Sequence, residues 1–374
     1  MSGNYDAIII GAGIVGTACA LECAQAGMRV AVVEGDVIGG GATAAGMGHI
    51  VVMDDSPAQL ALTKYSQQLW RELAPQLPAD AEYETTGTIW VAANPEEMNE
   101  VFRKQAVYRQ HGIAAEVLDS KSLREAEPNL HPALAGGLLV PSDAVLYPPC
   151  SARYLLEQAM RLGTVVLSKI AVKIGNGCVE CNDGSKLASP IIVNAAGAAS
   201  PELTPGLPVR KRKGHLVITD RYPGFVRHQL VELGYIKSAG SSTADSVAFN
   251  VQPRKTGQVL IGSSRQYDAE HKDVDQAILR RMMQRAQQYL QGLEDLSMVR
   301  AWTGFRASTP DKLPLIGPHL EDATIFLATG HEGLGITTAL ATARLLVDQC
   351  LGRDSEIPSE PYLPARMALE SHHA

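Results

Sequence analysis

The sequence has no segment that fits a membrane span or a secretory signal. Residues 7–21 carry no charge, but this stretch is too short to cross a bilayer and no basic leader precedes it. We therefore expect a cytoplasmic protein without a transmembrane segment. Contact with the periphery of the inner membrane stays open.

An excess of basic residues is also missing. Lysine and arginine number 33 against 40 aspartates and glutamates, which gives a net charge of −7, and there is no basic tail. This charge balance argues against nucleic acid as a partner. The one basic run, residues 210–213, is interpreted as a solvated strand end.

Cysteine is sparse, and its spacing argues against a metal centre. Cys178 and Cys181 form a single C-x-x-C pair ahead of a hairpin signal at residues 182–184, so we interpret them as two thiols on a strand. Cys19 and Cys23 are expected on the first helix as small core residues. Neither an H-E-x-x-H motif nor a nucleophile elbow is present, so no metal site is predicted.

The first 34 residues carry the most informative pattern. A short apolar run leads into Gly11-x-Gly13-x-x-Gly16, and a second apolar run, residues 30–33, ends at Glu34. This predicts the strand-turn-helix-strand unit that binds the ADP half of a dinucleotide, with the acid on the ribose and the phosphates at the helix N-terminus. The pattern alone does not distinguish NAD from FAD.

Three further glycine-rich segments favour a flavin over a nicotinamide cofactor. They are residues 42–49, 194–197 and 330–337, which together could enclose a large ring that stays bound. The last segment precedes a predicted helix. Its amides could therefore face the N1/C2=O edge of a flavin, which becomes anionic on reduction.

The length and the spacing of strand-like runs indicate two domains. A chain of 374 residues is long enough for about two. Runs at residues 214–219, 230–236, 246–251 and 258–262 predict an antiparallel sheet, and a polar helix is expected at about residues 273–292.

We predict an α/β (α+β) protein whose Rossmann-like nucleotide-binding domain is discontinuous. This FAD-binding domain is assigned residues 1–80, 145–206 and 312–374, because the apolar strand-and-glycine pattern returns near the C-terminus. An inserted substrate-binding domain, built on the antiparallel sheet, is assigned residues 81–144 and 207–311.

Motifs along the whole chain resemble those of one family. Besides the fingerprint, they lie at residues 44–47, 194–197, 302–306, 313–317 and 328–335. On these motifs the chain resembles the FAD-dependent amine oxidoreductases of the D-amino-acid oxidase superfamily. Members include glycine oxidase, sarcosine oxidase, D-amino-acid dehydrogenase, hydroxyproline dehydrogenase and the opine oxidase subunits.

The resemblance implies that FAD is the cofactor. It places the ADP portion at the fingerprint, the pyrophosphate and ring beside the second glycine-rich loop, and the pyrimidine edge under the last loop. The residues that it implies as cofactor-binding are Gly11, Gly13, Ile14, Gly16, Glu34, Gly35, Thr43, Ala44, Gly46, Met47, Val172, Ala196, Gly197, Gly330, His331, Glu332, Gly333, Leu334, Gly335, Ile336 and Thr337.

Arg306 is the candidate substrate anchor. A planar guanidinium binds a carboxylate through two parallel hydrogen bonds, which fixes both position and orientation. Arg306 also matches the arginine that pairs with the substrate carboxylate in glycine oxidase-like members. A surface arginine in a salt bridge is the alternative, which the apolar neighbours Trp302 and Phe305 disfavour.

Four more polar residues are candidates for the site. Asn250 falls where glycine oxidase-like members carry a carboxylate-binding tyrosine, so it either donates to the substrate or caps a strand. Arg265 could reach an acidic substrate, although a solvated strand-end position is favoured. His49 and His331 follow glycines in the flavin-facing loops, where a neutral imidazole could take the amine proton or tune the ring. A structural histidine bonded to the backbone is the alternative.

The resemblance implies oxidation of the C–N bond of a small amino acid to the imine by hydride transfer to the flavin. Residues 45–49 and 328–333 are most similar to the hydroxyproline dehydrogenase and opine oxidase branch, which favours a cyclic secondary amino acid such as D-hydroxyproline or D-proline. The alternatives are a glycine or sarcosine oxidase, or a flavin-carrying opine oxidase subunit that is inactive alone. The electron acceptor (a quinone, a partner subunit or oxygen) and a homo- or hetero-oligomeric state stay open.

Overall fold

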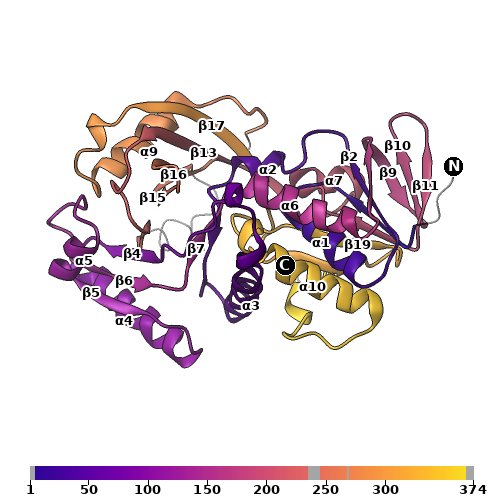
Figure 1. Cartoon of the computed structure of the whole chain (residues 1–374), viewed down its shortest axis with the longest axis horizontal. Coiled ribbons are helices and arrows are strands. Elements are labelled where there is room, and N and C mark those ends of the chain that lie inside the picture. Colours follow the sequence, from indigo (N-terminus) through magenta and orange to yellow (C-terminus); the bar gives the residue numbers. More distant parts are fainter. Residues whose placement is uncertain (1–4, 235–244, 268, 368–374) are drawn as a thin grey trace.

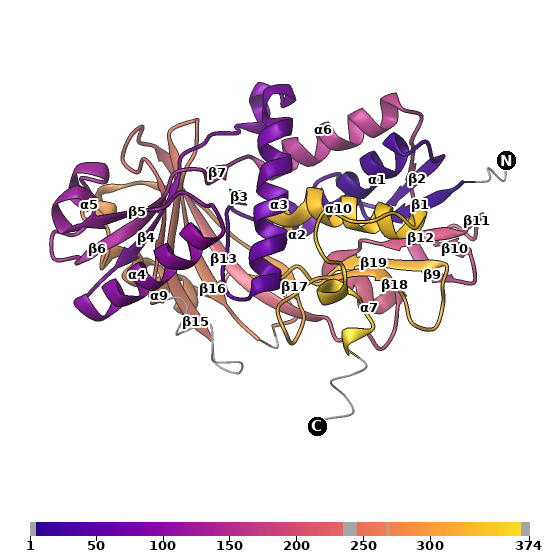
Figure 2. The ribbon, with the colours of Figure 1, turned by 90° about the horizontal axis from the view of Figure 1, so that it is seen from below.

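The structure is a computed structural model that describes residues 5–234, 245–267 and 269–367. The described chain forms two lobes (Figure 1). One lobe carries a six-stranded sheet and the other an eight-stranded sheet. Helix α3, Pro57–Leu73, lies between the lobes in both ribbon views (Figures 1 and 2).

The six-stranded sheet has the order β18-β19-β12-β1-β2-β8. Its pairs are parallel except at the β18 edge, where β18 runs antiparallel to β19. β1 pairs with both β2 and β12, so the nucleotide fingerprint starts from an inner strand. The strands are β1 (Ala7–Ile10), β2 (Val30–Glu34), β8 (Val165–Ser168), β12 (Ile191–Asn194), β18 (Leu315–Pro318) and β19 (Ile325–Thr329).

Both faces of this sheet are covered, which explains why β1 is apolar at every position. Ile9 packs into a core with helices α1 (Ile14–Gln25), α6 (Pro148–Arg161) and α10 (Gly335–Leu351). Ile8 and Ile10 pack on the opposite face against a small sheet, which consists of β9 (Ala171–Gly175), β10 (Cys178–Cys181) and β11 (Lys186–Ala188).

The cysteines take the positions that the sequence predicts. Cys178 and Cys181 lie on β10, which pairs with β11 as a hairpin. Cys19 and Cys23 are fully buried in the core on α1. Burial raises the pKa of both helix thiols above the usual range, so neither is a reactive thiolate at neutral pH.

The eight-stranded sheet has the order β17-β13-β16-β15-β14-β4-β6-β5. The sequence predicts an antiparallel sheet, and one pair of strands differs from that prediction. β14 runs parallel to β4. These two strands come from distant chain segments and no hairpin joins them, so their direction is not restricted to antiparallel. The strands are β4 (Thr88–Ala92), β5 (Glu116–Asp119), β6 (Gly136–Val140), β13 (Arg210–Arg221), β14 (Gln229–Glu232), β15 (Ser246–Pro253), β16 (Gln258–Arg265) and β17 (Met298–Ser308).

Helix α9, Gln276–Gln287, packs on β15 and β16 and is shorter than the predicted helix at 273–292. Its start is fixed by Asp275, whose carboxylate accepts hydrogen bonds from the amides of Ala277 and Ile278. The predicted strand at 230–236 corresponds to β14, and residues 235 and 236 lie outside the described part of the chain.

Short elements connect the two lobes and their loops. β3 (His49–Ile50) pairs antiparallel with β7 (Ala144–Val145) where the chain passes between the sheets. The other helices are α2 (Gly41–Ala45), α4 (Pro95–Gln110), α5 (Ser120–Ala126) and α7 (Ser200–Leu203), with 3-10 turns at Ala74–Gln76, Ala79–Ala81, Gly197–Ala199, Leu293–Asp295 and Glu360–Tyr362.

The strands of the two sheets come from separate ranges of the chain. The six-stranded sheet draws its strands from residues 7–34, 165–194 and 315–329, and the eight-stranded sheet from 88–140 and 210–308. This division supports the domain limits given above, which we retain as a proposal.

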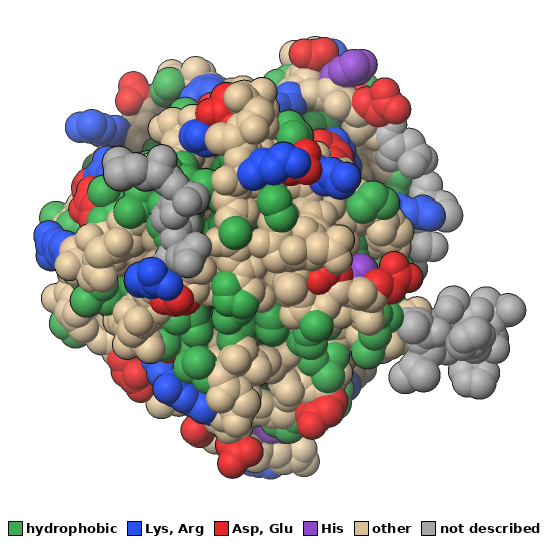
Figure 3. Space-filling model, turned by 90° about the vertical axis from the view of Figure 1, so that its right-hand side faces the viewer, with side chains coloured by type: hydrophobic (Ala, Val, Ile, Leu, Met, Phe, Trp, Pro, Cys, Tyr) green, Lys and Arg blue, Asp and Glu red, His purple; other side chains and the backbone are tan. Residues whose placement is uncertain are grey.

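One end of the six-stranded lobe is shown in Figure 3. Hydrophobic side chains lie there in separate groups, with charged side chains of both signs among them. None of the helices in the described segments is both long and apolar enough to cross a membrane.

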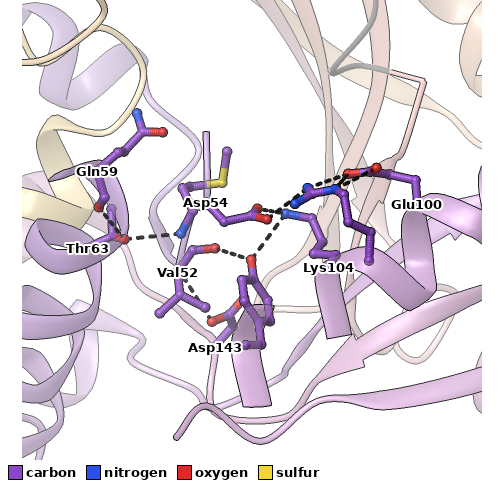
Figure 4. A network of polar contacts seen from close by, with 10 residues as sticks. Val52, Asp54, Gln59, Thr63, Glu100, Lys104 and Asp143 are labelled. Carbon is purple, nitrogen blue, oxygen red and sulfur yellow. Dashed lines mark hydrogen bonds and ion pairs between the residues drawn. The ribbon is translucent and has the colours of Figure 1, made fainter. Parts of the chain in front are cut away.

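A buried polar network joins the lobes near α3 (Figure 4). The fully buried ammonium of Lys104 pairs with Asp54 and lies 4.3 Å from the centroid of the Trp90 ring. Nearby, Asp143 accepts a hydrogen bond of 2.7 Å from Gln67, and burial raises the pKa of Asp143 to about 7. The segment after β3 is therefore held by both lobes.

Substitution of Lys104 tests how much this network contributes. Lys104→Ala removes the buried cation of Asp54 and leaves only the half-exposed Arg103, at 3.0 Å, beside that carboxylate, so we expect the free energy of unfolding to fall by about 2–3 kcal/mol. The control is Lys121→Ala, which removes an exposed pair with Glu125 at 3.8 Å and should change it by less than about 1 kcal/mol. Denaturant unfolding measures both, and equal effects would contradict the assignment.

Candidate active site

A cavity of about 1020 Å³ runs between the two sheets. Its walls include the fingerprint turn at one end and the inner face of the eight-stranded sheet at the other. An elongated cavity with one end at the carboxyl ends of parallel strands is the expected position for a dinucleotide.

The glycines of the fingerprint have different surroundings. Gly11 has a φ of +99°, and a Cβ there would lie 2.7 Å from the Ala195 carbonyl oxygen. A Cβ on Gly16 would overlap the Gly11 carbonyl oxygen, so this glycine serves close packing and does not line the cavity. Gly13 faces the cavity, and among the described residues a Cβ there would meet only the Thr43 hydroxyl, at 3.2 Å.

Glu34 is held at the cavity wall by backbone donors. Its two carboxylate oxygens accept hydrogen bonds from the amides of Ala12 at 2.7 Å and Asp36 at 2.9 Å. Gly35 and Val172 line the same end, and Val172 is 53% exposed. We propose that this end holds the adenosine portion of the cofactor.

The second glycine-rich loop joins the helix N-terminus to the eight-stranded sheet. The Thr43 hydroxyl accepts a hydrogen bond of 2.9 Å from the Ile14 amide at the start of α1. The Met47 carbonyl accepts one of 2.8 Å from the buried Gln252 side chain on β15. A Cβ on Gly46 would lie 2.7 Å from the Ile336 side chain, so this loop and the last one are in direct contact.

The other two loops are fixed by side-chain hydrogen bonds. The Asn194 amide donates to the Ser200 carbonyl and the Thr204 hydroxyl, which shapes the turn that contains Ala196 and Gly197. In the last loop, the Thr337 hydroxyl donates to the His49 carbonyl at 2.7 Å. Most of the residues predicted to bind the cofactor line the cavity. Among the described residues, the exceptions are Gly16, Ala44, Gly330 and Thr337.

His49 and Asn250 are brought together at the end of the cavity formed by the eight-stranded sheet, which we propose is the substrate end. The Asn250 side-chain nitrogen lies 3.3 Å from His49 Nε2, and both residues line the cavity. Burial, with a smaller effect of the Arg306 charge, lowers the pKa of His49 to about 4, although a hydrogen bond with the Gln229 side chain acts in the opposite direction. The imidazole is therefore neutral at physiological pH.

His331 has a different environment. Its Nε2 lies 3.0 Å from the Thr342 hydroxyl on α10, and burial lowers its pKa to about 3. Its ring is therefore neutral and bonded to a helix side chain. We retain a role at the cofactor as a proposal, with positioning of the loop as its basis.

Arg306 lies across the face of the sheet. Its Nη1 donates a hydrogen bond of 3.0 Å to the Ser264 carbonyl on β16. The guanidinium passes directly over Gly214 on β13, where a Cβ would collide with it. Ser264 is itself fixed, because its hydroxyl bonds the backbone amide and Nδ1 of His215, each at 2.9 Å.

Two interpretations of basic residues from the sequence are wrong. In the run 210–213, Arg212 and Lys213 are buried rather than solvated, because β13 lies inside the sheet between β16 and β17. The Arg265 side chain is 12% exposed rather than solvated and lies 3.9 Å from Glu332 Oε1. Both Arg212 and Arg265 line the cavity.

The sequence also gave no indication of Ser263 and Gln252 at this end. Ser263 lines the cavity on β16, two residues before Arg265, and Gln252 lies on β15 two residues after Asn250. The available signal was the period of two along a strand, since Ser263 is two residues from Arg265 on β16 and Gln252 is two residues from Asn250 on β15.

Comparison with known proteins agrees with this arrangement. The model of a family described as FAD dependent oxidoreductase matches residues 6–349. The chain belongs to that family. It is 26% identical to a glycine oxidase of Geobacillus kaustophilus over 97% of both chains, and 27% identical to hydrogen cyanide synthase subunit HcnC of Pseudomonas aeruginosa over 99% of this chain and 98% of that one.

Solved structures show the same fold. The crystal structure of the Geobacillus kaustophilus glycine oxidase superimposes with a TM-score of 0.86, at 25% identity, over 96% of this chain and 98% of that one. An L-proline dehydrogenase of P. horikoshii gives 0.89, at 22% identity, over 99% of both chains.

Membership of this FAD-dependent oxidoreductase family settles the class and the cofactor. The protein is an amino-acid oxidase or dehydrogenase that acts on CH–NH or CH–NH2 groups with FAD. The cavity fits that group, since Gly13 leaves the backbone accessible, the α1 N-terminus faces it and Glu34 lies at its adenosine end.

Gly13→Val tests the cofactor cradle. The branched side chain would crowd Thr43 and project into the cavity, so we expect the purified variant to carry no FAD. The flavin absorbance per protein measures this, with circular dichroism as the check on folding. A folded variant with its full flavin content would contradict the assignment of Gly13 to the FAD-binding site.

His331 provides a pH test with a definite sign. The unfolded chain binds a proton on this residue below about pH 6.5, whereas the native ring does so only near pH 3, so the native state loses stability as pH falls between these values. In His331→Gln, position 331 has no titratable group, so it makes no such contribution to the loss of stability at low pH. Its deficit in unfolding free energy relative to wild type should therefore shrink by about 2 kcal/mol from pH 8 to pH 5. A deficit independent of pH would contradict the burial of a neutral ring.

Proposed function

We propose that the enzyme oxidises a small amino acid at its C–N bond to the imine, with a cyclic secondary amino acid such as D-proline or D-hydroxyproline as the substrate. The observation that carries this proposal is the position of Arg306. Its guanidinium lies flat over Gly214 in the wall of the cavity, with one nitrogen bonded to Ser264 and the rest available to a carboxylate.

The bound FAD supplies the chemistry of two-electron oxidation. The protein binds and orients the substrate. We propose that Arg306 holds the carboxylate, so that the Cα–H bond is presented in one direction only. The left-handed glycine turns and the α1 N-terminus would hold the cofactor, through the residues given above that line the cavity.

His49 and Asn250 are proposed to bind the amine end. The His49 ring is neutral, so one ring nitrogen is an acceptor that can receive a hydrogen bond from the amine. Asn250 lies within hydrogen-bond distance of that ring and faces the same cavity. A neutral acceptor suits an amine, which must lose its positive charge before oxidation at the C–N bond.

Two alternatives have specific support. Glycine or sarcosine is favoured by the similarity to glycine oxidases along the whole chain. A subunit of a larger assembly is favoured by the similarity to a protein named as a hydrogen cyanide synthase subunit. The electron acceptor, the oligomeric state and a cytoplasmic location stay predictions.

The experiment is anaerobic mixing of the purified holoprotein with D-proline, D-hydroxyproline, glycine and sarcosine. Bleaching of the flavin absorbance by the cyclic amino acids, faster than by glycine, is the expected result. Bleaching by glycine alone would favour the first alternative. Reoxidation by a quinone-like dye and by oxygen, compared afterwards, identifies the class of acceptor.

Arg306→Ala should lower kcat/KM for the substrate, mostly by raising KM, while FAD stays bound. The expected decrease corresponds to a loss of about 2–4 kcal/mol in transition-state binding. Arg306→Lys should recover only part, because the planar fork is lost. The control is Arg300→Ala on the same strand, whose side chain lies near Trp302 away from this contact. Steady-state kinetics measures all three, and an unchanged kcat/KM in the alanine variant would remove Arg306 from the site.

A further inference from the structure

Two arginines stand directly opposite each other at the substrate end. Arg212 on β13 and Arg306 on β17 are register partners in the antiparallel pair. Opposed like charges destabilise a sheet unless a counter-ion lies between them. Arg265 on β16 lines the same cavity, so three guanidinium groups surround one region of the wall.

Glu332 is the carboxylate within this cluster. It pairs with Arg212 and lies 3.9 Å from the Arg265 Nε, and its own side chain is 12% exposed. Burial acts to raise the pKa of Glu332, but Arg306, Arg265 and Arg212 together outweigh it and lower that pKa, so the carboxylate is charged.

The backbone holds the Glu332 carboxylate in this place. Glu332 has a φ of +51°, and its amide donates a hydrogen bond of 2.8 Å to the Ala307 carbonyl, next to Arg306. Arg212 is fixed on its other side by Tyr267, whose hydroxyl it contacts and whose ring centroid lies 4.7 Å from the guanidinium. The carboxylate is therefore a built part of the wall.

All three arginines stabilise the charged Glu332 carboxylate, but their contacts differ. Arg212 pairs with that carboxylate and Arg265 lies 3.9 Å from it, whereas Arg306 donates one nitrogen to the Ser264 carbonyl at 3.0 Å, and we assign the other side of its guanidinium to a ligand. The cluster thus has one position for an outside carboxylate, at Arg306.

We propose that Glu332 is a specificity-determining residue: its carboxylate occupies the place, beside Arg212 and Arg265, that a second substrate carboxylate would take. The cavity therefore accepts monocarboxylic amino acids and rejects dicarboxylic ones. A second carboxylate would meet Glu332 at close range inside a buried site, where repulsion between like charges is only weakly screened. This inference rests on the proposed role of Arg306 as the carboxylate anchor.

The test compares binding of propionate and succinate, which differ by one carboxylate. Each is titrated into the holoprotein, and the dissociation constant is read from the change in the flavin spectrum. In wild type, succinate should bind at least about tenfold more weakly than propionate. In Glu332→Gln, which exposes Arg212 and Arg265 to the ligand, the ratio should fall by at least about tenfold and succinate should bind more tightly than in wild type.

Two controls separate charge from shape and from general electrostatics. Glu332→Asp keeps the carboxylate and should keep the wild-type preference for propionate. Glu125→Gln makes the same substitution at an exposed residue that does not line the cavity and pairs with Lys121 at 3.8 Å, and should leave the ratio unchanged. If the glutamine variant retains too little flavin for spectra, the ratio of the two dissociation constants is measured by calorimetric titration of propionate and succinate into this variant and into Glu332→Ala.

The outcomes distinguish this inference from the proposed function. An unchanged ratio in Glu332→Gln and Glu332→Ala overturns the role of Glu332, even if the enzyme oxidises monocarboxylic amino acids. A lowered ratio supports that role, even if no amino acid tested reduces the flavin, in which case the proposed reaction is wrong. Loss of propionate binding in Glu332→Gln without any gain for succinate would show that Glu332 only positions Arg306, and would also overturn the inference.

Discussion

The attachment of one loop to both lobes is the constraint on which the site depends. Residues 330–337 carry the Glu332 amide, which bonds the eight-stranded sheet at Ala307, and the Thr337 hydroxyl, which bonds the His49 carbonyl between the lobes. The buried Trp70 on α3 donates from its ring nitrogen to the carbonyls of Ile336 and Thr337, each at 3.1 Å. The cofactor end and the substrate end of the cavity are thereby built on one fixed segment.

The charges of the cavity follow from burial. Histidines lose their protons when they are desolvated, so His49 and His331 are neutral, whereas guanidinium groups keep theirs and need carboxylates. Glu332 supplies that carboxylate on the protein side, and the substrate would supply it at Arg306. The end of the cavity formed by the eight-stranded sheet thus combines a neutral acceptor beside an amide, His49 with Asn250, and a set of paired cations.

The sequence predicts the parts of the fold that depend on local requirements. A Cβ on Gly11 or Gly16 would meet backbone within the same turn or beside it, so the fingerprint can be recognised without knowledge of the rest. The parallel pairing of β4 with β14 and the burial of Arg212 and Arg265 depend on which strands lie side by side. A basic run at a strand end has the same pattern whether its neighbour is solvent or another strand, so its burial could not be predicted.

The two sides of the cavity are therefore under different constraints. The glycine turns belong to the FAD-binding side, and FAD is the cofactor by which the family is described. Few side chains are possible at Gly11 and Gly16, because a Cβ there would collide with backbone atoms. The opposite wall is a sheet face, where each alternate residue can change without altering the backbone. Asn250, Ser263 and Arg265 project from such positions on β15 and β16. We propose that the substrate is selected by these side chains together with Glu332, which belongs to the same wall but comes from the loop at residues 330–337.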